Sequence, residues 1–171
     1  VAEFSVSDSI VAKQMTELIN KDLKDIMSAD EVVICDGMSC VGGNTISFAR
    51  GFKKVIANEL NPERYNMLVN NAQEVLKLDN IDYYNQDIRK LSAIDECNVL
   101  FLDPEWGGKG SKVDKLKIGN TDLTSFVDEI FSEKTNISMI SLKLPYYYDI
   151  STLKKYNSEA GYQQNIYYLG E

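Results

Sequence analysis

The chain has 171 residues, of which 44% are hydrophobic and 26% charged, so we expect one globular domain with a real core over residues 1–171. The formal net charge of −8 excludes a protein that grips nucleic acid along its whole surface, although recognition of a single nucleotide stays open. Three cysteines without a CxxC pair, no histidine and no membrane-length apolar run argue against a zinc site and a membrane protein, and favour a reducing intracellular compartment, nucleus or cytoplasm.

Helical spacing and apolar runs alternate along the chain. The first helix is predicted over residues 9–28, with Ser7, Asp8 or Ser9 as its cap. Strands are predicted over residues 31–35, 54–60, 81–85, 98–102, 136–144 and 165–170. Further helices are predicted from about residue 44, from Pro62 to about residue 76, and over residues 121–131. Apolar strands separated by helices indicate an α/β fold with a mainly parallel, doubly wound sheet and helices on both faces.

Four consecutive predicted strands end in, or lead to, an acidic residue. These residues are Asp36, Glu59, Asp87 and Asp103. In a doubly wound sheet the ligand binds beyond the carboxyl ends of the strands, so the four carboxylates are expected at one edge. Any one of them alone is more often structural or solvated, but the set points to a binding site.

The spacing of the first two acids is typical of a nucleotide cofactor. Glu59 follows Asp36 by 23 residues, which is where such folds place the acid that binds ribose hydroxyls, and this fits NAD and S-adenosyl-L-methionine alike. No intact G-x-G-x-x-G is present, and four carboxylates would repel a pyrophosphate. The sulfonium and amino group of S-adenosyl-L-methionine are both cationic, so the acidic edge favours the methyl donor.

Three segments, CDGMSCVGGNTISFA, VIANELNPERYNMLVNNAQ and VLFLDPEWGG, resemble the trimethylguanosine synthase family of RNA cap guanine-N2 methyltransferases. FSVS, LKLP and YYLGE extend the similarity over most of the chain. The resemblance implies a Rossmann-like class I methyltransferase fold, with S-adenosyl-L-homocysteine as product and the 7-methylguanosine cap of an RNA, or a cap analogue, as acceptor. The family's segment upstream of FSVS is expected to be lacking from this domain, and residues 1–30 are expected to pack on it. We also expect a monomer.

The resemblance also implies a role for each matching residue. For the methionine part of the cofactor, the implied residues are Asp36, Met38, Gly42, Gly43, Asn44 and Thr45, with Ser7 at its carboxylate. Glu59 is implied to bind the ribose, and Asp87 the adenine amine. Asn70 and Asn71 match an Asn-Asn pair of which one lies near the guanine pocket, and we take Asn71 as the candidate, although helix-surface asparagines are usually solvated.

The only tryptophan, Trp106, lies between an acidic residue and two glycines at a predicted strand end. A methylguanine carries delocalised positive charge, and an indole face is the best aromatic partner for a cation, so Trp106 is expected to stack on the cap guanine. The alternative is a tryptophan that fills the core. Asp103 and the carbonyl of Pro104 are then expected to accept hydrogen bonds from the exocyclic amine and to align it for in-line methyl transfer. Whether Asp103 also takes the proton stays open.

Lysines follow the tryptophan closely. Lys109, Lys112, Lys115 and Lys117 against Asp114 give a local charge of +3, which is either a contact for the cap triphosphate or a solvated loop. Where the family has an arginine after LP this chain has Tyr146, so Lys143 or the tyrosines are expected to replace its phosphate contact. Other departures from the family pattern are Glu105 for a proline, Asp103 for a serine and Cys40 for a glycine.

Two other functions compete with cap methylation. The first is an amino-directed methyltransferase of the same fold, acting on ribosomal RNA guanine N2, adenine N6 or a glutamine amide. The second is an inactive module that binds a cap or a protein partner. An inactive module, however, has no need of a cofactor pocket with four acidic residues. A nicotinamide-dependent dehydrogenase is least favoured, because the glycine fingerprint is broken and no histidine is present.

Overall fold

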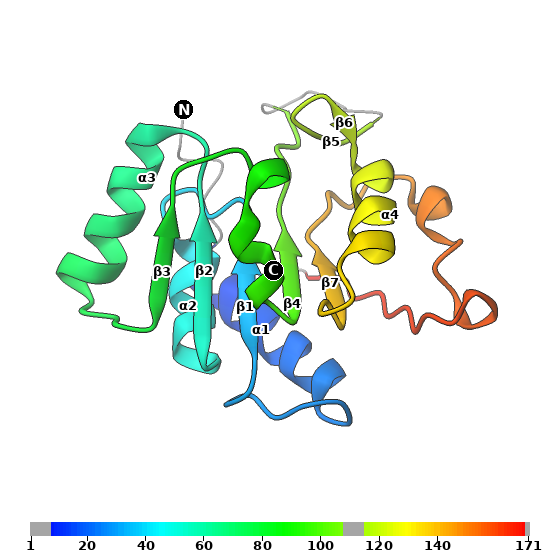
Figure 1. The fold of residues 1–171 in the computed structure, drawn as a ribbon, viewed down its shortest axis with the longest axis horizontal. Helices are drawn as coiled ribbons and strands as arrows, with labels where there is room; N and C mark the ends of the chain where they lie inside the picture. The colour runs from blue at the N-terminus through cyan, green and yellow to red at the C-terminus, as the bar shows by residue number, and fades with distance from the viewer. Residues whose placement is uncertain (1–7, 108–114, 170–171) are drawn as a thin grey trace.

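The computed structural model describes residues 8–107 and 115–169, which form a parallel sheet with helices on both faces (Figure 1). The strands of this sheet are β1 (Val33–Asp36), β2 (Lys54–Asn58), β3 (Ile81–Tyr84), β4 (Val99–Leu102) and β7 (Met139–Leu142). Their order is β3-β2-β1-β4-β7, and all four pairings are parallel. The predicted mainly parallel, doubly wound α/β fold is therefore confirmed.

The connections between strands are mostly helical. The α-helices are α1 (Ser9–Leu23), α2 (Gly43–Gly51), α3 (Pro62–Val69) and α4 (Leu123–Glu133), and α3 continues as a π-helix, η2 (Asn70–Val75). Short 3-10 helices are η3 (Ile88–Lys90), η4 (Ser92–Glu96), η5 (Ile150–Leu153) and η6 (Ser158–Ala160). A small antiparallel hairpin of β5 (Lys117–Ile118) and β6 (Thr121–Asp122) precedes α4. Within the described ranges, no helix is long and apolar enough to cross a membrane.

Local sequence explains where the helices begin. Asp8, one of the three predicted caps, accepts a hydrogen bond from Ile10 N at 2.8 Å and starts α1. Asn61 caps α3 in the same way, and Pro62 occupies the first turn, where its missing N–H costs nothing. The Asn61 cap fixes the point at which the chain leaves β2 and turns back over the sheet.

The sheet separates two apolar cores, because successive side chains of a strand point to opposite faces. In β4, Val99 and Phe101 join the core under α1 and α2, whereas Leu100 and Leu102 join the core that includes η4 and α4. All four side chains are fully buried. Burial on both faces explains why this strand is apolar at every position rather than at alternate ones.

The strand order reverses between β1 and β4, and this positions the site. From β1 the chain moves outward through β2 to β3, then returns to the other side of β1 as β4. Asp36 at the end of β1 pairs in register with Phe101, so Asp103 follows just beyond on the neighbouring strand. Since the five strands of this sheet are parallel, the acids at or beyond the ends of β1, β2, β3 and β4 lie at one edge, as predicted.

The strand predicted over residues 165–170 is wrong for the residues that the structure describes, since no strand forms there through Leu169. This segment instead runs beside α1, where Tyr167 Oη donates to Asp22 Oδ1 at 2.7 Å, and Tyr168 is 85% exposed. An apolar run becomes a strand only where a neighbouring strand offers its backbone, and here the neighbour is a helix. The strand predicted over residues 136–144 is also shorter, as β7.

Candidate functional site

Asp36 is the most deeply buried acid of the edge, with an exposed fraction of 0%. Its Oδ2 accepts a hydrogen bond from Thr45 Oγ1 at 2.5 Å, and its Oδ1 is buried without a hydrogen-bond partner among the described residues. The pKa of Asp36 is raised to about 7, chiefly by burial and to a smaller extent by the nearby Asp103 carboxylate, against the hydrogen bond of Thr45 and smaller opposing contributions from the Met38 backbone and the Ser39 side chain. A buried carboxylate with one unpartnered oxygen is suited to a cationic ligand, which would remove the cost of its burial.

The loop after β1 brings backbone close to that carboxylate. Gly42 has a φ of +103°, and a Cβ on it would lie 3.0 Å from Leu68 Cδ1, so glycine is required there. Gly43 then begins α2, which places buried Asn44 and Thr45 in its first turn. These are predicted cofactor-loop residues, of which Thr45 is hydrogen-bonded to Asp36 and Asn44 to Asp103.

Cys40 is the strained position of this loop. Its φ of +50° is unusual for any residue but glycine, asparagine or aspartate, and it stands where the family pattern has a glycine. Its backbone N–H donates to Glu59 Oε2 at 2.9 Å, which holds the loop after β1 against the loop after β2. Met38 is partly buried against the core in the same loop.

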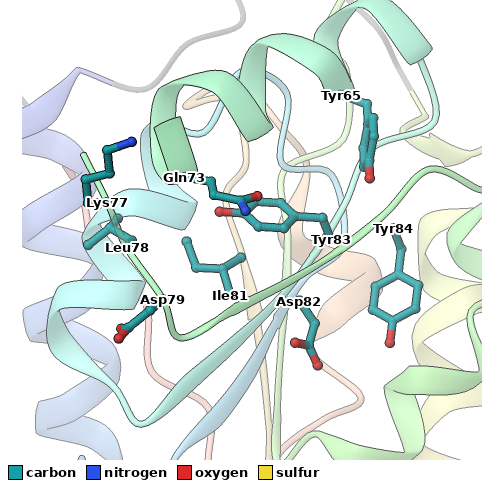
Figure 2. Close-up of a pocket in the computed structure, with 9 residues that line it drawn as sticks. All are labelled: Tyr65, Gln73, Lys77, Leu78, Asp79, Ile81, Asp82, Tyr83 and Tyr84. Carbon is teal, nitrogen blue, oxygen red and sulfur yellow. The ribbon is translucent and has the colours of Figure 1, made fainter. Parts of the chain in front are cut away.

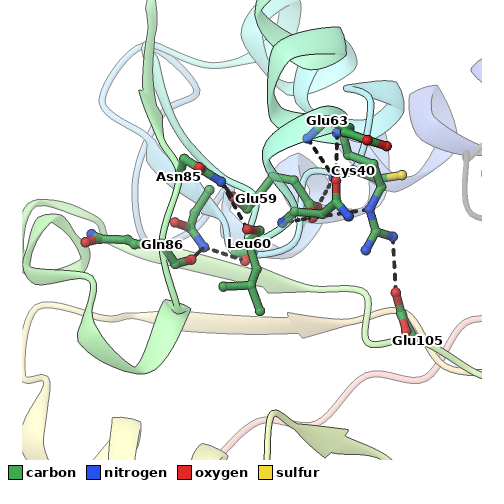
Figure 3. A network of polar contacts seen from close by, with 11 residues as sticks. Cys40, Glu59, Leu60, Glu63, Asn85, Gln86 and Glu105 are labelled. Atoms are coloured by element: carbon green, nitrogen blue, oxygen red, sulfur yellow. Dashed lines mark hydrogen bonds and ion pairs between the residues drawn. The ribbon is translucent and has the colours of Figure 1, made fainter.

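Glu59 is the centre of a polar network (Figure 3), with an exposed fraction of 5%. Besides the Cys40 N–H, it accepts Asn61 N–H on Oε1 at 2.8 Å, and its own carbonyl accepts from Asn85 Nδ2 at 2.6 Å. These bonds tie together the loops after β1, β2 and β3. A carboxylate oxygen has two acceptor positions, and Oε2 has a single partner among the described residues, which leaves one position for a ribose hydroxyl.

The predicted adenine contact, Asp87, is already paired. Its Oδ1 accepts from Arg89 N at 3.0 Å and from Arg89 Nε at 2.9 Å, and the hydrogen bond and charge of Arg89 lower the pKa of Asp87. Arg89 also donates to Asn120 in the turn between β5 and β6. An adenine amine at Asp87 would therefore share the carboxylate with Arg89.

Leu60 is a residue that pattern reasoning missed at this edge. It directly follows Glu59, yet it is 65% exposed. An exposed apolar side chain next to a strand-end acid offers a surface for an aromatic ring. The position of Leu60 directly after Glu59 is the sequence feature that could have indicated this. Its carbonyl is fixed by Asn85 Nδ2 at 3.1 Å.

The loop after β4 places Asp103 and Trp106 beside one lysine. Lys143, which directly follows β7, puts its Nζ 2.9 Å from Asp103 Oδ2 and 5.1 Å from the centroid of the Trp106 ring. The Asp103 and Lys143 side chains are only 14% and 17% exposed. Burial raises the pKa of Asp103, while the charge and hydrogen bond of Lys143 and the Asn44 side chain lower it. The structure thus joins the candidate cofactor loop, the acceptor acid and the indole ring.

Trp106 is partly buried and has features of both predicted roles. It packs against the core on the α4 side of the sheet, while Lys143 lies over its ring. Tyr147 Oη donates to the Trp106 carbonyl at 3.3 Å and helps to fix the loop. The buried Trp106 Nε1 has no hydrogen-bond partner among the described residues, although a buried indole N–H usually has one.

Arg64 was not predicted, yet it joins the two halves of the site. From α3 its Nε lies 3.4 Å from Glu59 Oε1, and its Nη1 lies 3.1 Å from Glu105 Oε1 (Figure 3). Glu105 stands between Asp103 and Trp106 in sequence, where the family pattern has a proline. An ion pair therefore fixes the loop to α3 at the position where the family has a rigid residue.

Other predicted substrate residues lie apart from this cluster. Asn71 Nδ2 donates to the Val41 carbonyl at 3.0 Å and so supports the cofactor loop, while Asn70 lies at the surface. Tyr146 is 92% exposed and stacks edge-on against Tyr147. Predicted residues that lie outside the described ranges are Ser7, Lys109 and Lys112. In the part of the chain that the structure describes, no group of three His, Cys, Asp or Glu side chains is placed to hold a metal ion.

An open groove of about 760 Å³ lies elsewhere, along the outer edge of β3 (Figure 2). Tyr65, Tyr83 and Tyr84 line it together with Lys77 and Gln73. None of the predicted site residues contributes to it, and Asp79 and Asp82 offset the charge of the lysine. The acidic edge between β1 and β4, rather than this groove, therefore carries the candidate chemistry.

Comparison with known proteins gives three kinds of match. A family model described as RNA cap guanine-N2 methyltransferase matches residues 31–168. An uncharacterized protein, L320, of Acanthamoeba polyphaga mimivirus is 35% identical over 126 residues, which cover 70% of this chain and 48% of that protein. Trimethylguanosine synthase of Schizosaccharomyces pombe is 28% identical over 158 residues, 88% of this chain and 64% of the relative. The chain thus spans about half of one relative and just under two thirds of the other.

The solved structures that this chain is similar to are more distant in sequence. An RNA methyltransferase from Salinibacter ruber, in complex with S-adenosyl-L-homocysteine, is 23% identical with a TM-score of 0.47, covering 57% of this chain and 59% of that one. Trm5b from Pyrococcus abyssi is 16% identical with a TM-score of 0.49, covering 74% of this chain and 31% of that one.

Proposed function

Because the chain belongs to the RNA cap guanine-N2 methyltransferase family, as its motifs predict, we propose that it methylates the exocyclic N2 amine of 7-methylguanosine in an RNA cap. The methyl donor is S-adenosyl-L-methionine, and the products are di- or trimethylguanosine and S-adenosyl-L-homocysteine. One observation carries this function: the buried Asp36, with an unpartnered oxygen, lies beside Asp103 and the adjoining Trp106 loop at the ends of β1 and β4.

The residues present fit the cofactor. When bound, S-adenosyl-L-methionine supplies an electrophilic methyl group on a cationic sulfur. Asp36 Oδ1 suits its ammonium, and Gly42 and Gly43 let the loop backbone approach its methionine part. Glu59 is assigned to the ribose hydroxyls and Asp87 to the adenine amine. Outside the described residues, Ser7 keeps its predicted place at the carboxylate.

The residues of the acceptor site align the N2 amine of the guanine rather than increase its reactivity. Trp106 stacks on the guanine, while Asp103 and the Pro104 carbonyl accept hydrogen bonds from the N2 amine and direct its lone pair at the methyl group. An N–C bond forms as the C–S bond breaks, and the surplus proton leaves to solvent or to Asp103. The predicted phosphate contacts, Lys109, Lys112 and Tyr146, remain part of the proposal. A monomer acting in the nucleus or the cytoplasm likewise remains a proposal.

Asp103→Asn is expected to slow methyl transfer about a hundredfold, because one misaligned contact to a reacting group has an effect of this size. The protein is incubated with S-adenosyl-L-methionine and 7-methylguanosine diphosphate, with unmethylated GDP alongside, and the products are weighed by mass spectrometry. The wild-type chain should add one or two methyl groups, and the variant should bind S-adenosyl-L-homocysteine with unchanged affinity.

Two other outcomes would replace this function. Methylation of an adenine-containing oligonucleotide, but of neither guanosine nucleotide, would show a different amino acceptor. Failure to bind S-adenosyl-L-homocysteine by calorimetry would indicate a binding module without catalysis. A variant Asp103→Asn as active as the wild-type chain would remove Asp103 from the aligning role and leave the acceptor unchanged.

Glu105→Ala should raise the KM for the acceptor about threefold and leave cofactor affinity unchanged, because the Arg64–Glu105 ion pair is largely exposed, with Glu105 76% accessible. Glu105→Pro, which restores the family's residue, should behave like the wild-type chain. Glu63→Ala, an exposed acid at the start of α3, is the matched control. Equal KM values for the Glu105→Ala and wild-type chains would show that the pair does not position the loop.

A further inference from the structure

We propose that Arg89 is a positioning residue that couples the two ligands of the site, so that binding of the methyl donor strengthens binding of the acceptor nucleotide. Arg89 acts through the β5–β6 hairpin, which follows the Trp106 loop in the chain. This inference rests on the proposed function and deepens it, since it concerns how cofactor and acceptor influence each other at that site.

The side chain of Arg89 connects the loop after β3 to the β5–β6 hairpin. On one side its Nε lies 2.9 Å from Asp87 Oδ1 and 3.1 Å from Asp87 Oδ2, and its Nη2 also donates to Oδ2. On the other side its Nη1 donates to the side-chain oxygen of Asn120. The guanidinium lies against Gly119, whose φ is +61° and on which a Cβ would lie 2.7 Å from Arg89 Cζ. A planar group with five N–H donors is suited to holding two partners in this way.

The hairpin depends on such contacts because it is short. β5 and β6 pair through two residues each, and a two-stranded hairpin is marginally stable by itself in water. Leu116, directly before β5, and Ile118 are each 1% exposed and join the core against which Trp106 packs. Among the described elements the hairpin is the next one after β4, so it anchors the far end of the segment that contains the Trp106 loop. A contact that holds the hairpin therefore acts on the acceptor side of the site.

A count of hydrogen bonds indicates how an adenine amine changes the contacts of Arg89. A carboxylate has about four acceptor positions, and those of Asp87 accept from the Arg89 backbone N–H, from Nε on both oxygens and from Nη2. An adenine amine that binds Asp87 therefore takes a position from the guanidinium. The displaced N–H is next to the hairpin turn, where the side-chain oxygen of Asn120 has a second acceptor position and a single partner among the described residues. Cofactor binding thus moves hydrogen bonding of Arg89 from Asp87 to the hairpin.

The sign of the coupling follows from this exchange. A hairpin that is held more firmly loses less conformational entropy when the acceptor binds, so the two ligands bind with positive cooperativity. S-adenosyl-L-homocysteine should raise the affinity for 7-methylguanosine diphosphate about tenfold, which is a typical coupling between two sites. By linkage, the nucleotide should raise the affinity for S-adenosyl-L-homocysteine by the same factor.

The test measures this coupling with Trp106, the only tryptophan of the chain, as the probe. Its fluorescence is titrated with 7-methylguanosine diphosphate in the absence and in the presence of saturating S-adenosyl-L-homocysteine. In Asn120→Ala the effect of S-adenosyl-L-homocysteine should fall from about tenfold to less than about twofold, because Arg89 loses its partner on the hairpin. The affinity of this variant for S-adenosyl-L-homocysteine alone should be unchanged, since Asp87 keeps its contacts.

Three further variants separate the geometry of Arg89 from its charge and from general stability. Arg89→Lys keeps the positive charge beside Asp87, but a compact ammonium cannot hold Asp87 and Asn120 together, so the coupling should be lost. Asn120→Asp keeps an acceptor oxygen for Arg89 and should retain the coupling. Asn157→Ala is the matched control, because it removes a 3.1 Å hydrogen bond from Ala160 N in another turn, and it should also retain the coupling.

The failures of the two proposals are distinguishable. A wild-type chain in which S-adenosyl-L-homocysteine changes the nucleotide affinity less than about twofold would overturn the coupling, and so would undiminished coupling in Asn120→Ala or Arg89→Lys. Loss of the coupling in Asn120→Asp or Asn157→Ala would also overturn the role of Arg89. In each of these cases nucleotide binding would uphold the acceptor site. No fluorescence change with the nucleotide, in a protein that binds S-adenosyl-L-homocysteine by calorimetry, would overturn the proposed function together with this inference.

Discussion

Trp106→Ala is expected to lower methylation of 7-methylguanosine diphosphate at least about a hundredfold, while the affinity for S-adenosyl-L-homocysteine changes less than about threefold. A base stacked on an aromatic ring gains roughly 1–3 kcal/mol, and the ring also fixes the angle at which the N2 amine meets the methyl group. The cofactor pocket lies around Asp36 and Glu59, and neither residue has a hydrogen bond to the indole in the described part of the chain. Initial rates and calorimetry measure the two effects separately.

A structural role for Trp106 predicts a different pattern. The ring packs on the same core as Phe131, a partly buried aromatic residue in α4 that stacks on Tyr156 and Tyr162. Phe131→Ala is therefore the matched control, with a similar loss of stability to urea and nearly unchanged methylation. If Trp106→Ala loses cofactor affinity as steeply as activity, the tryptophan is a core residue of the loop and the stacking assignment fails.

Much of the site was predictable because parallel strands deliver their ends to one edge. Asp36, Glu59 and Asp103 each follow an apolar run, and alternating strands and helices require those runs to be parallel. The position in sequence therefore fixed the position in space. Gly42 was also readable, since its φ of +103° is what a glycine pair before a helix commonly provides.

Contacts between elements distant in sequence could not be predicted in this way. Lys143 reaches Asp103 because β7 pairs with β4, and Arg64 reaches Glu105 because α3 lies over the same edge. No local sequence pattern indicates either of these two contacts. The strand prediction for residues 165–170 failed for a related reason. Residues 165–169 are apolar enough for a strand, but they lie beside α1, where no strand offers them a partner.

Asp36→Asn is expected to weaken S-adenosyl-L-methionine binding at least about a hundredfold and, at the same time, to stabilise the ligand-free protein at alkaline pH. Removing one partner of a buried charge pair typically costs 3–5 kcal/mol, which is the expected loss in binding. The asparagine keeps an oxygen for the 2.5 Å hydrogen bond from Thr45, so the loop should keep its shape.

The sign of the stability change follows from the direction of the pKa shift. The folded protein holds the proton of Asp36 up to about pH 7, whereas an unfolded aspartate releases it near 3.8. Between these values the folded state binds more protons, so stability falls as the pH rises from about 4 to 7, and the full cost, on the order of 4 kcal/mol, is present above that range. Urea unfolding should show the variant more stable than the wild-type chain at pH 8 and equal to it at pH 4.

Cofactor binding and urea unfolding of Asp36→Asn together test whether the Asp36 carboxylate serves ligand binding at a cost in stability. If Asp36→Asn is stabilising at pH 8 and also deficient in cofactor binding, the burial of Asp36 is a cost that the cationic cofactor offsets on binding. S-adenosyl-L-methionine should then raise the stability of the wild-type chain more at pH 8 than at pH 5, since its ammonium needs the ionised carboxylate. A wild-type chain whose stability is flat between pH 4 and 8 would show that Asp36 ionises normally and that its unpartnered oxygen is reached by solvent.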